Sequence, residues 1–236
     1  GASGGIGTTL VQLILQGSPC VLGAHRSTAK PLSPKLKKER VVIDLQSTLQ
    51  NESDCRQLVD SFVDQAGGIS GLVVLVGGIS QKGHWKNISE KAWKDDIDLN
   101  LNVPFFLART ALERMKKKGG QIVLMGTESA LHGGSPTSFP YGVAKRGVEC
   151  LVEGLAREGA KHDIQVNGVR AGFIRSGFHE RWQGKTPEDI KKRIEMIPLK
   201  RAGEPEEAAA LIMYLLSGWA RFVTGQMISI SGGDWL

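Results

Sequence analysis

The chain has 236 residues, 41% hydrophobic and 23% charged, which is usual for a soluble globular protein with one sizeable core. Its net charge of +6 is modest, and its dense basic clusters, 116–118 and 191–193, lack interleaved aromatic residues, which disfavours nucleic acid as a partner. No apolar run approaches the roughly 20 residues of a membrane span, so we expect no membrane partner either.

Strand-like and helix-like segments alternate along the chain. Short apolar segments rich in β-branched residues, typical of strands buried on both faces, lie at 20–24, 40–44, 72–76, 121–125, 164–169 and 225–230. Helical patterns lie between them at 8–16, 51–65, 93–115, 141–158 and 204–217, with Asn51 as a candidate cap. This alternation predicts an α/β fold: a single doubly wound Rossmann-type domain over 1–236, with a parallel sheet flanked by helices.

The chain opens on a glycine loop, Gly1-Ala-Ser-Gly-Gly-Ile-Gly7. Gly1, Gly5 and Gly7 let the backbone turn tightly, and the helix that follows points its free N–H groups at a phosphate. The first strand of such a fold should precede Gly1. We therefore expect a trimmed N-terminus, which leaves a lost targeting segment open beside a cytoplasmic location.

The three cysteines, Cys20, Cys55 and Cys150, are odd in number, widely separated and without metal-ligand spacing. We interpret them as reduced, mostly buried thiols in a reducing compartment, and we expect no metal site.

Tyr141 and Lys145 are four residues apart and so share one face of a predicted helix. An ammonium beside a phenol favours the phenolate, so the pair suits proton transfer. On its own the pattern is weak, because it also occurs on many solvated helix surfaces. The Tyr141–Lys145 pattern becomes informative because a predicted phosphate-binding loop lies 140 residues earlier in the same chain.

With these two motifs the chain resembles the short-chain dehydrogenase/reductase family, over essentially its whole length. Asp44-Leu45 matches the end of the family's third strand, Asn100 its helix asparagine, and 170–176 its loop beside the nicotinamide. Segments 201–208 and 224–233 resemble its C-terminal signatures. Several agreements in order are far more specific than any one of them.

The resemblance implies a catalytic group. Tyr141 would be the general acid or base, Lys145 would lower the pKa of Tyr141 and hold the nicotinamide ribose, and Asn100 would hold a water that links Lys145 to solvent. The family's serine has two candidates here: Thr127, 14 residues before the tyrosine, which the strand register favours, and Ser129, 12 residues before it.

The resemblance also implies a nicotinamide cofactor. A dinucleotide enzyme that uses NAD needs a carboxylate after the second strand, but this chain has His25, Arg26 and Ser27 there. A guanidinium can pair with a 2′-phosphate, so we predict NADP(H), with Arg26 as the phosphate reader. The predicted cofactor contacts are Gly1, Ser3, Gly5, Ile6, Gly7, Arg26, Ser27, Asp44, Leu45, Gly77, Tyr141, Lys145, Gly172, Ile174 and Ser176.

Two segments depart from the family pattern, and a third is predicted to cover the substrate. Gly77-Gly78 replaces side-chain amides that brace the central strands, and Ala171 replaces a proline. Residues 175–203 are the least regular and are predicted to form a lid over the substrate, with Trp182 and Met196 as candidate lining residues.

The leading functional prediction is an NADPH-dependent reductase of a ketone or 3-oxoacyl thioester, resembling 3-oxoacyl-[acyl-carrier-protein] reductases. An alcohol or sugar dehydrogenase working oxidatively is the alternative, and a cofactor-binding regulator without turnover is less favoured. We expect a homotetramer or homodimer, because Phe105, Phe106, Val148 and Leu151 extend beyond one apolar stripe on their helices.

Overall fold

The computed structural model describes residues 1–17, 20–27, 42–234 and 236. Its strands are β1 (Leu22–Arg26), β2 (Val42–Gln46), β3 (Gly71–Val74), β4 (Gly120–Thr127), β5 (Ile164–Ala171) and β6 (Met227–Ile230). β1 pairs with β2, and β3, β4, β5 and β6 pair in that order, with every pairing parallel. The predicted α/β fold with a parallel sheet is confirmed.

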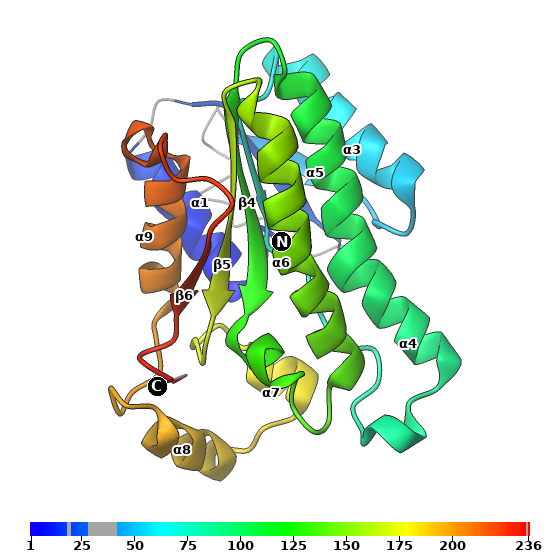
Figure 1. The fold of residues 1–236 in the computed structure, drawn as a ribbon, viewed down its shortest axis with the longest axis vertical. Coiled ribbons are helices and arrows are strands. Elements are labelled where there is room, and N and C mark those ends of the chain that lie inside the picture. Colours follow the sequence, from blue (N-terminus) through cyan, green and yellow to red (C-terminus); the bar gives the residue numbers. More distant parts are fainter. Residues whose placement is uncertain (18–19, 28–41, 235) are drawn as a thin grey trace.

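Helices cover both faces of these strands (Figure 1). They are α1 (Gly5–Gly17), α3 (Glu52–Ala66), α4 (Glu90–Ile97), α5 (Val103–Met115), α6 (Phe139–Ala160), α7 (Phe178–Gln183), α8 (Pro187–Met196) and α9 (Pro205–Leu216). The described residues also form four short turns: η1 (Trp85–Asn87), η2 (Asp98–Asn102), η3 (Glu128–His132) and η4 (Gly218–Ala220). Asn51 caps α3 as predicted, since its side chain accepts a hydrogen bond from the backbone N–H of Asp54.

Alternate residues of the central strands supply two separate cores. Ile122 and Leu124 of β4 pack into one cluster with residues of α3, α5 and α6. Val123, between them, packs into a second cluster with residues of α1 and α9. Because strand side chains alternate between faces, a strand apolar at every position is covered by helices on both sides.

The predicted helix 93–115 is not continuous. It is divided into α4, the π-helical turn η2 and α5, and the interruption carries Asn100. Apolar periodicity runs through both helices and could not show the break. A π-helical turn inside a helix is a frequent feature of functional sites.

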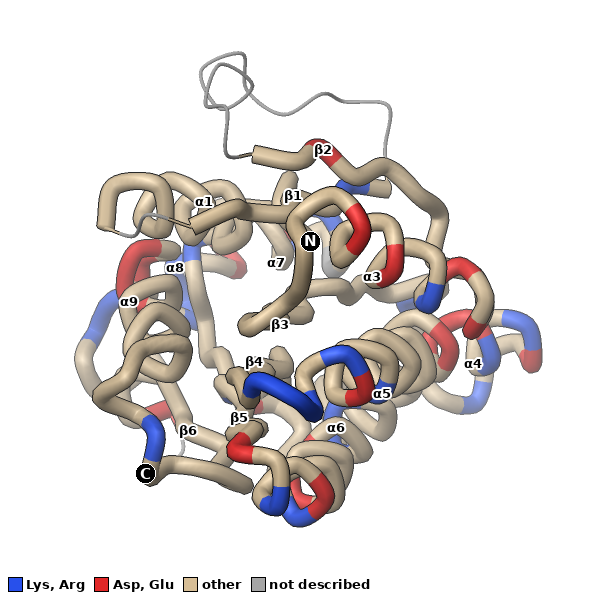
Figure 2. Tube along the Cα trace, turned by 90° about the horizontal axis from the view of Figure 1, so that it is seen from above, with Lys and Arg blue, Asp and Glu red and all other residues tan. Residues whose placement is uncertain are grey.

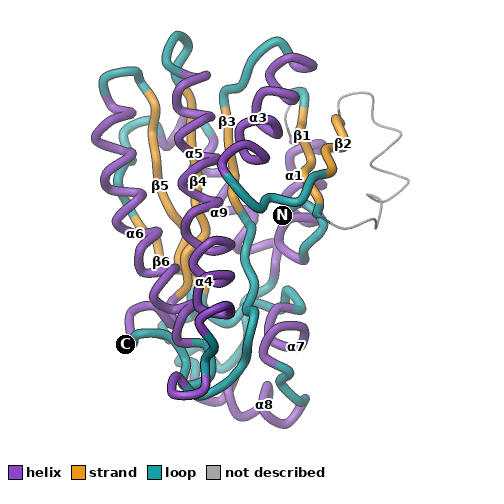
Figure 3. The backbone as a smooth tube through the Cα atoms, turned by 90° about the vertical axis from the view of Figure 1, so that its right-hand side faces the viewer, coloured by secondary structure: helices purple, strands orange, loops and turns teal. Residues whose placement is uncertain are grey.

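Residues 175–203 are more regular than we predicted, because they contain α7 and α8. Thr186 and Asp189 form a reciprocal capping box at the start of α8, a signal present in the sequence. Figure 3 shows both helices beneath the carboxyl ends of β3, β4 and β5, where ligands bind in open parallel sheets.

Two smaller predictions are wrong. Among the cysteines, Cys55 is buried but Cys20 and Cys150 are exposed, so the thiols are not mostly buried. Val148 of α6 is fully buried in the core cluster that it shares with residues of α5 and so is not available to a partner subunit, whereas Phe105, Phe106 and Leu151 are partly exposed.

Acidic and basic residues are interspersed along α3, α4, α5 and α6 rather than gathered on one basic face (Figure 2). Many form pairs within a helix; Lys94 lies 2.5 Å from Glu90 and Lys116 lies 2.7 Å from Glu113. Among the described residues, no helix combines the length and apolarity that crossing a bilayer needs.

Candidate active site

A cavity of about 760 Å³ runs from the glycine loop to the catalytic pair. It lies where the carboxyl ends of the strands meet residues 175–203. Most predicted site residues line it: Gly1, Ser3, Gly5, Ile6, Gly7, Ser27, Gly77, Thr127, Ser129, Tyr141, Lys145, Gly172, Ile174 and Ser176. Its volume falls in the range of ligand sites, roughly 300–1,000 Å³.

The glycine loop is packed too tightly for side chains. A Cβ on Gly5 would lie 2.6 Å from the carbonyl oxygen of Ser176, and one on Gly7 would collide with the carbonyl of Gly1. α1 begins at Gly5, so its free N–H groups and positive dipole end face the cavity. This end of the cavity fits a phosphate group, as the sequence predicts.

Tyr141 lies in the first turn of α6, 8% exposed, with its ring centroid 5.6 Å from that of Phe178. Burial raises the pKa of its phenol, while a hydrogen bond with Thr127 lowers it and the charge of Asp96 raises it. The sequence predicts that Lys145 lowers this pKa, but burial, which raises it, is the largest effect. The phenol therefore holds its proton, the state that a general acid needs.

The Lys145 ammonium is 5.8 Å from the centroid of the Tyr141 ring. It donates to the backbone carbonyl of Met125, within β4, at 3.0 Å and to that of Val76, after β3, at 3.3 Å. Burial lowers the pKa of Lys145 to about 8. Two carbonyls therefore fix the ammonium where the strand ends meet the catalytic helix.

Asn100 is fully buried and does not line the cavity. Its amide nitrogen donates to the carbonyls of Gly78 and Asp96, each at 2.9 Å, and its oxygen accepts from the Gly78 N–H at 3.2 Å. Both amide hydrogens are thus committed to backbone. The side chain braces the Gly77-Gly78 segment, a role that the predicted water contact did not include.

Both candidate hydroxyl groups reach the cavity. Thr127 ends β4 and Ser129 lies in η3, and their oxygens are 3.2 Å apart. Thr127 is also within 3.5 Å of the carbonyl of Ala171, its register partner on β5. The hydrogen bond between Thr127 and Tyr141 favours Thr127, in agreement with the strand register.

Arg26 and Asp44, predicted as separate cofactor contacts, are paired with each other. The Nε of Arg26 is 2.8 Å from one carboxylate oxygen of Asp44, and Nη2 is 3.1 Å from the other. Arg26 is 8% exposed, and neither residue lines the cavity, nor does Leu45. The reason is β1–β2 pairing, which sets the adjacent strand ends side by side.

His25 and Ser27 line the cavity on either side of Arg26 in sequence, because alternate strand residues face opposite sides. The His25 ring is 3.0 Å from the carbonyl of Ser47, and burial lowers its pKa to about 4. A neutral imidazole at neutral pH therefore borders this end of the cavity.

Residues 175–203 supply lining residues that the sequence did not single out, among them Phe178, Arg181 and Lys185. Trp182 and Met196 line the cavity, as proposed from sequence, and Trp182 packs 3.1 Å from where a Gly78 Cβ would lie. Glu128 also lines the cavity. Its position between the candidate hydroxyl residues Thr127 and Ser129 is the feature of the sequence that could have indicated this. Trp235, suggested as an interface residue, lies outside the described residues.

The model of the family described as enoyl-(acyl carrier protein) reductase matches residues 1–234. The chain belongs to the short-chain dehydrogenase/reductase family. It is 30% identical over 237 residues to 3-oxoacyl-[acyl-carrier-protein] reductase FabG of Rickettsia typhi, covering 99% of this chain and 93% of that protein.

Other family members are similar over nearly the whole chain. A 3alpha-hydroxysteroid dehydrogenase of Mediterraneibacter gnavus is 28% identical, with 98% of this chain and 93% of that protein covered. A solved short-chain dehydrogenase/reductase of Mycobacterium ulcerans has a TM-score of 0.88 at 26% identity, covering 99% of this chain and 87% of that one. This chain is thus an oxidoreductase that acts on CH–OH groups or the corresponding carbonyls.

The arrangement fits a nicotinamide dinucleotide. A helix N-terminus stands at one end of the cavity, and a buried ammonium and phenol stand at the other. The nicotinamide, when bound, supplies the hydride. The residues predicted to bind phosphate and those predicted to transfer the proton line these two ends of the cavity.

Proposed function

We propose that this chain is an NADPH-dependent carbonyl reductase whose substrate is a ketone or a 3-oxoacyl thioester. The observation that carries the proposal is that Tyr141, Lys145 and Thr127 meet in the cavity that the glycine loop also lines. The Tyr141 phenol, kept protonated by burial, donates its proton to the carbonyl oxygen, and Thr127 orients that oxygen.

The cofactor would extend from the glycine loop to Lys145. Ser3, Ile6 and the loop glycines would contact the pyrophosphate, and Ser27 the adenosine ribose. Gly77, Gly172, Ile174 and Ser176 would contact the nicotinamide half beside Lys145. Their shared lining of one cavity supports this assignment.

The preference for NADP rests on the residues that follow β1. His25 and Ser27 border the cavity there, and neither carries a carboxylate that would repel a 2′-phosphate. Arg26 stands between them but is paired with Asp44. We propose that a 2′-phosphate competes with Asp44 for the Arg26 guanidinium, whose planar fork suits either anion.

This competition makes a prediction about two variants. Arg26→Ala should weaken NADPH binding about tenfold or more and leave NADH nearly unchanged, because a charge-assisted contact of about 1.5–3 kcal/mol is lost. Asp44→Asn, the matched control, should leave NADPH affinity unchanged or tighter, because it releases the guanidinium. Titration of each variant with both cofactors decides; equal losses for both cofactors in Arg26→Ala would mean that the pair is structural.

An alcohol or sugar dehydrogenase working oxidatively is the second candidate, favoured by the hydroxysteroid dehydrogenase among the relatives. NADPH oxidation with a panel of ketones and β-ketothioesters, and NADP⁺ reduction with the matching alcohols, tests both. Reduction should exceed oxidation at neutral pH. If the protein binds the cofactor but catalyses neither reaction, the remaining possibility is a cofactor-binding regulator without turnover.

The remaining assignments also belong to the proposal. Residues 175–203 act as a substrate lid on a single domain, supported by the share of the cavity wall that α7 and α8 supply. The protein is cytoplasmic, in keeping with free cysteines at 20, 55 and 150.

A further inference from the structure

A second cavity, of about 470 Å³, lies behind the ends of β4 and β5 and beside the C-terminal segment. It is formed by the end of β4, the segment after β5, residues 199–207 and the segment that follows β6. Glu128, Phe173 and Ile174 form a wall shared with the catalytic cavity. Of the residues predicted for the cofactor or for catalysis, Ile174 alone also lines this second cavity.

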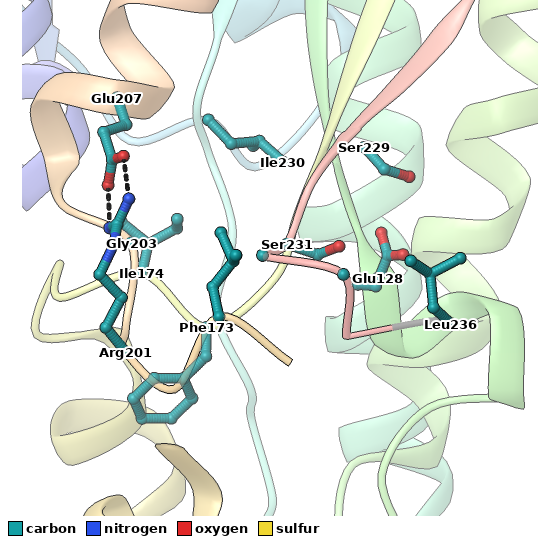
Figure 4. A pocket seen from close by; sticks show the side chains of 13 residues that line it. Glu128, Phe173, Ile174, Arg201, Gly203, Glu207, Ser229, Ile230, Ser231 and Leu236 are labelled. Atoms are coloured by element: carbon teal, nitrogen blue, oxygen red, sulfur yellow. Dashed lines mark hydrogen bonds and ion pairs between the residues drawn. The ribbon is translucent and has the colours of Figure 1, made fainter. Parts of the chain in front are cut away.

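Glu128 is the anomaly in this cavity. Its side chain is 3% exposed, and neither carboxylate oxygen has a hydrogen-bond partner among the residues that the structure describes. Figure 4 shows the carboxylate directed into the cavity near Ser231 and Leu236. A buried carboxylate without a donor is costly, and proteins normally pair such a group.

The other polar groups that line this cavity do not neutralise Glu128. Arg201 binds both oxygens of Glu207, each at 2.7 Å, and a further nitrogen contact goes to the carbonyl of Ala202 (Figure 4). The hydroxyl of Ser229 accepts from Arg170 at 2.9 Å. The Glu128 carboxylate therefore has no partner among the described side chains that line this cavity.

We propose that this cavity binds an organic cation, a primary ammonium or guanidinium on a short apolar body, whose N–H groups donate to Glu128. The apolar body would pack on Leu199, Ile230 and Leu236, which line the open side of the cavity. A bare divalent cation fits less well, because it takes several oxygen ligands, and no group of three or more acidic, histidine or cysteine side chains forms within the described part of the chain.

A ligand bound to Glu128 would also affect the neighbouring catalytic cavity. Glu128 lies between Thr127 and Ser129, so a cation bound to its carboxylate contacts the segment that carries both hydroxyls. The cation would be an effector beside the reaction rather than a substrate.

Calorimetric titration of the whole chain with phenethylamine, and with phenethyl alcohol as its uncharged counterpart, tests the proposal. The amine should bind, and the alcohol should bind roughly tenfold to a hundredfold more weakly. Glu128→Gln should weaken the amine by a similar factor and leave the alcohol unchanged. Glu158→Gln, the same substitution at an exposed site on α6, should leave the amine affinity unchanged.

A third variant locates the probe. Leu199→Trp adds bulk at an exposed residue that lines the second cavity and not the catalytic one, so it should also weaken the amine. Unchanged affinity in Leu199→Trp would place the amine in the catalytic cavity and overturn the proposal. Absent amine binding, or equal binding of amine and alcohol, would overturn it as well.

A partner subunit is the competing occupant of the cavity. Light scattering on Glu128→Gln distinguishes a partner subunit from a small cation. If a small cation binds, the variant should have the same particle mass as the unsubstituted protein. A lower mass would mean that a side chain of a second copy satisfies Glu128, and the small-cation site would be wrong.

Discussion

At the scale of single residues, the Tyr141 phenol is acted on by opposing effects. Burial raises its pKa most, and the hydrogen bond with Thr127 counteracts this. A fully solvated tyrosine would ionise more easily but could not be kept dry against a substrate carbonyl. The buried phenol is thus suited to donating its proton once a substrate oxygen replaces water.

Substitutions at the three hydroxyl residues should separate proton transfer from orientation. Tyr141→Phe should abolish turnover with cofactor binding intact, because only the transferable proton is removed. Thr127→Val should lower kcat roughly 100-fold or more, as loss of a transition-state donor costs about 2.7–4 kcal/mol. Steady-state kinetics with a reducible ketone measures both effects.

Ser129→Ala is the control for that series, since Ser129 reaches Thr127 at 3.2 Å but has no resolved contact with Tyr141. Ser129→Ala should lower kcat much less than Thr127→Val does. The reverse ranking would make Ser129 the substrate's partner and Thr127 its support.

The buried ammonium of Lys145 predicts a pH dependence. Its pKa in the folded chain is about 8, against 10.5 for a free lysine, so the unfolded chain binds more protons between these values. The contribution of Lys145 to stability therefore rises with pH across that window. In the native state the positive charge is lost above about pH 8.

NADPH affinity should fall as pH rises past about 8, because the anionic cofactor loses a cation from its site. Lys145→Met should bind NADPH more weakly at neutral pH and show no such step. Fluorescence titration across neutral and alkaline pH provides the measurement. A step that persists in Lys145→Met would belong to another group.

At the scale of elements, the π-helical turn η2 connects the outer helices to the loop after β3. Asn100 holds Gly78 from this turn, and Asp96, one turn earlier, accepts from the Ser80 N–H at 2.6 Å. A Cβ on Gly77 would lie 3.0 Å from the Asn100 oxygen and 3.4 Å from the Lys145 nitrogen. One helix interruption therefore fixes the backbone against the catalytic ammonium.

Asn100→Ala should destabilise the fold by about 2–4 kcal/mol, because it removes three buried hydrogen bonds and leaves their backbone partners unsatisfied. Thermal unfolding should show a lower Tm by several degrees. Asn102→Ala, in the same turn, removes one surface contact with Asp98 and should change Tm little. Similar losses in both variants would mean that the turn, and not the Asn100 brace, sets the stability.

At the scale of the whole molecule, partly exposed apolar residues remain on the face of α5 and α6. Phe105 and Phe106 have ring centroids 5.6 Å apart, and the Arg109 guanidinium lies over both rings. Leu151 on α6 is also only partly buried. Such a face suits a two-fold interface between copies of the chain.

Light scattering at micromolar concentration should give a dimer or tetramer, a multiple of the 25.5 kDa subunit mass. Phe105→Glu should lower the mass by placing a charge in the interface. Phe222→Glu is the comparison, because Phe222 is fully exposed in the segment before β6. Dissociation in Phe222→Glu and not in Phe105→Glu would move the interface to that side.

The sequence alone was sufficient for the α/β class, the family and most of the residues predicted for the site, although it missed α7 and α8. Its β-branched runs, glycine loop and Tyr141–Lys145 spacing are local patterns, and local spacing determines periodicity and register along one element. The strand register also favoured Thr127, the side chain that lowers the pKa of the Tyr141 phenol.

The tertiary structure decided the pairings between distant segments. The pairing of Arg26 with Asp44, the commitment of Asn100 to Gly78 and the unpartnered carboxylate of Glu128 each depend on which strand ends lie side by side. The pKa of Tyr141 likewise followed from burial and not from the neighbouring lysine. Desolvation and charge pairing depend on three-dimensional proximity, which the spacing of residues along a chain does not record.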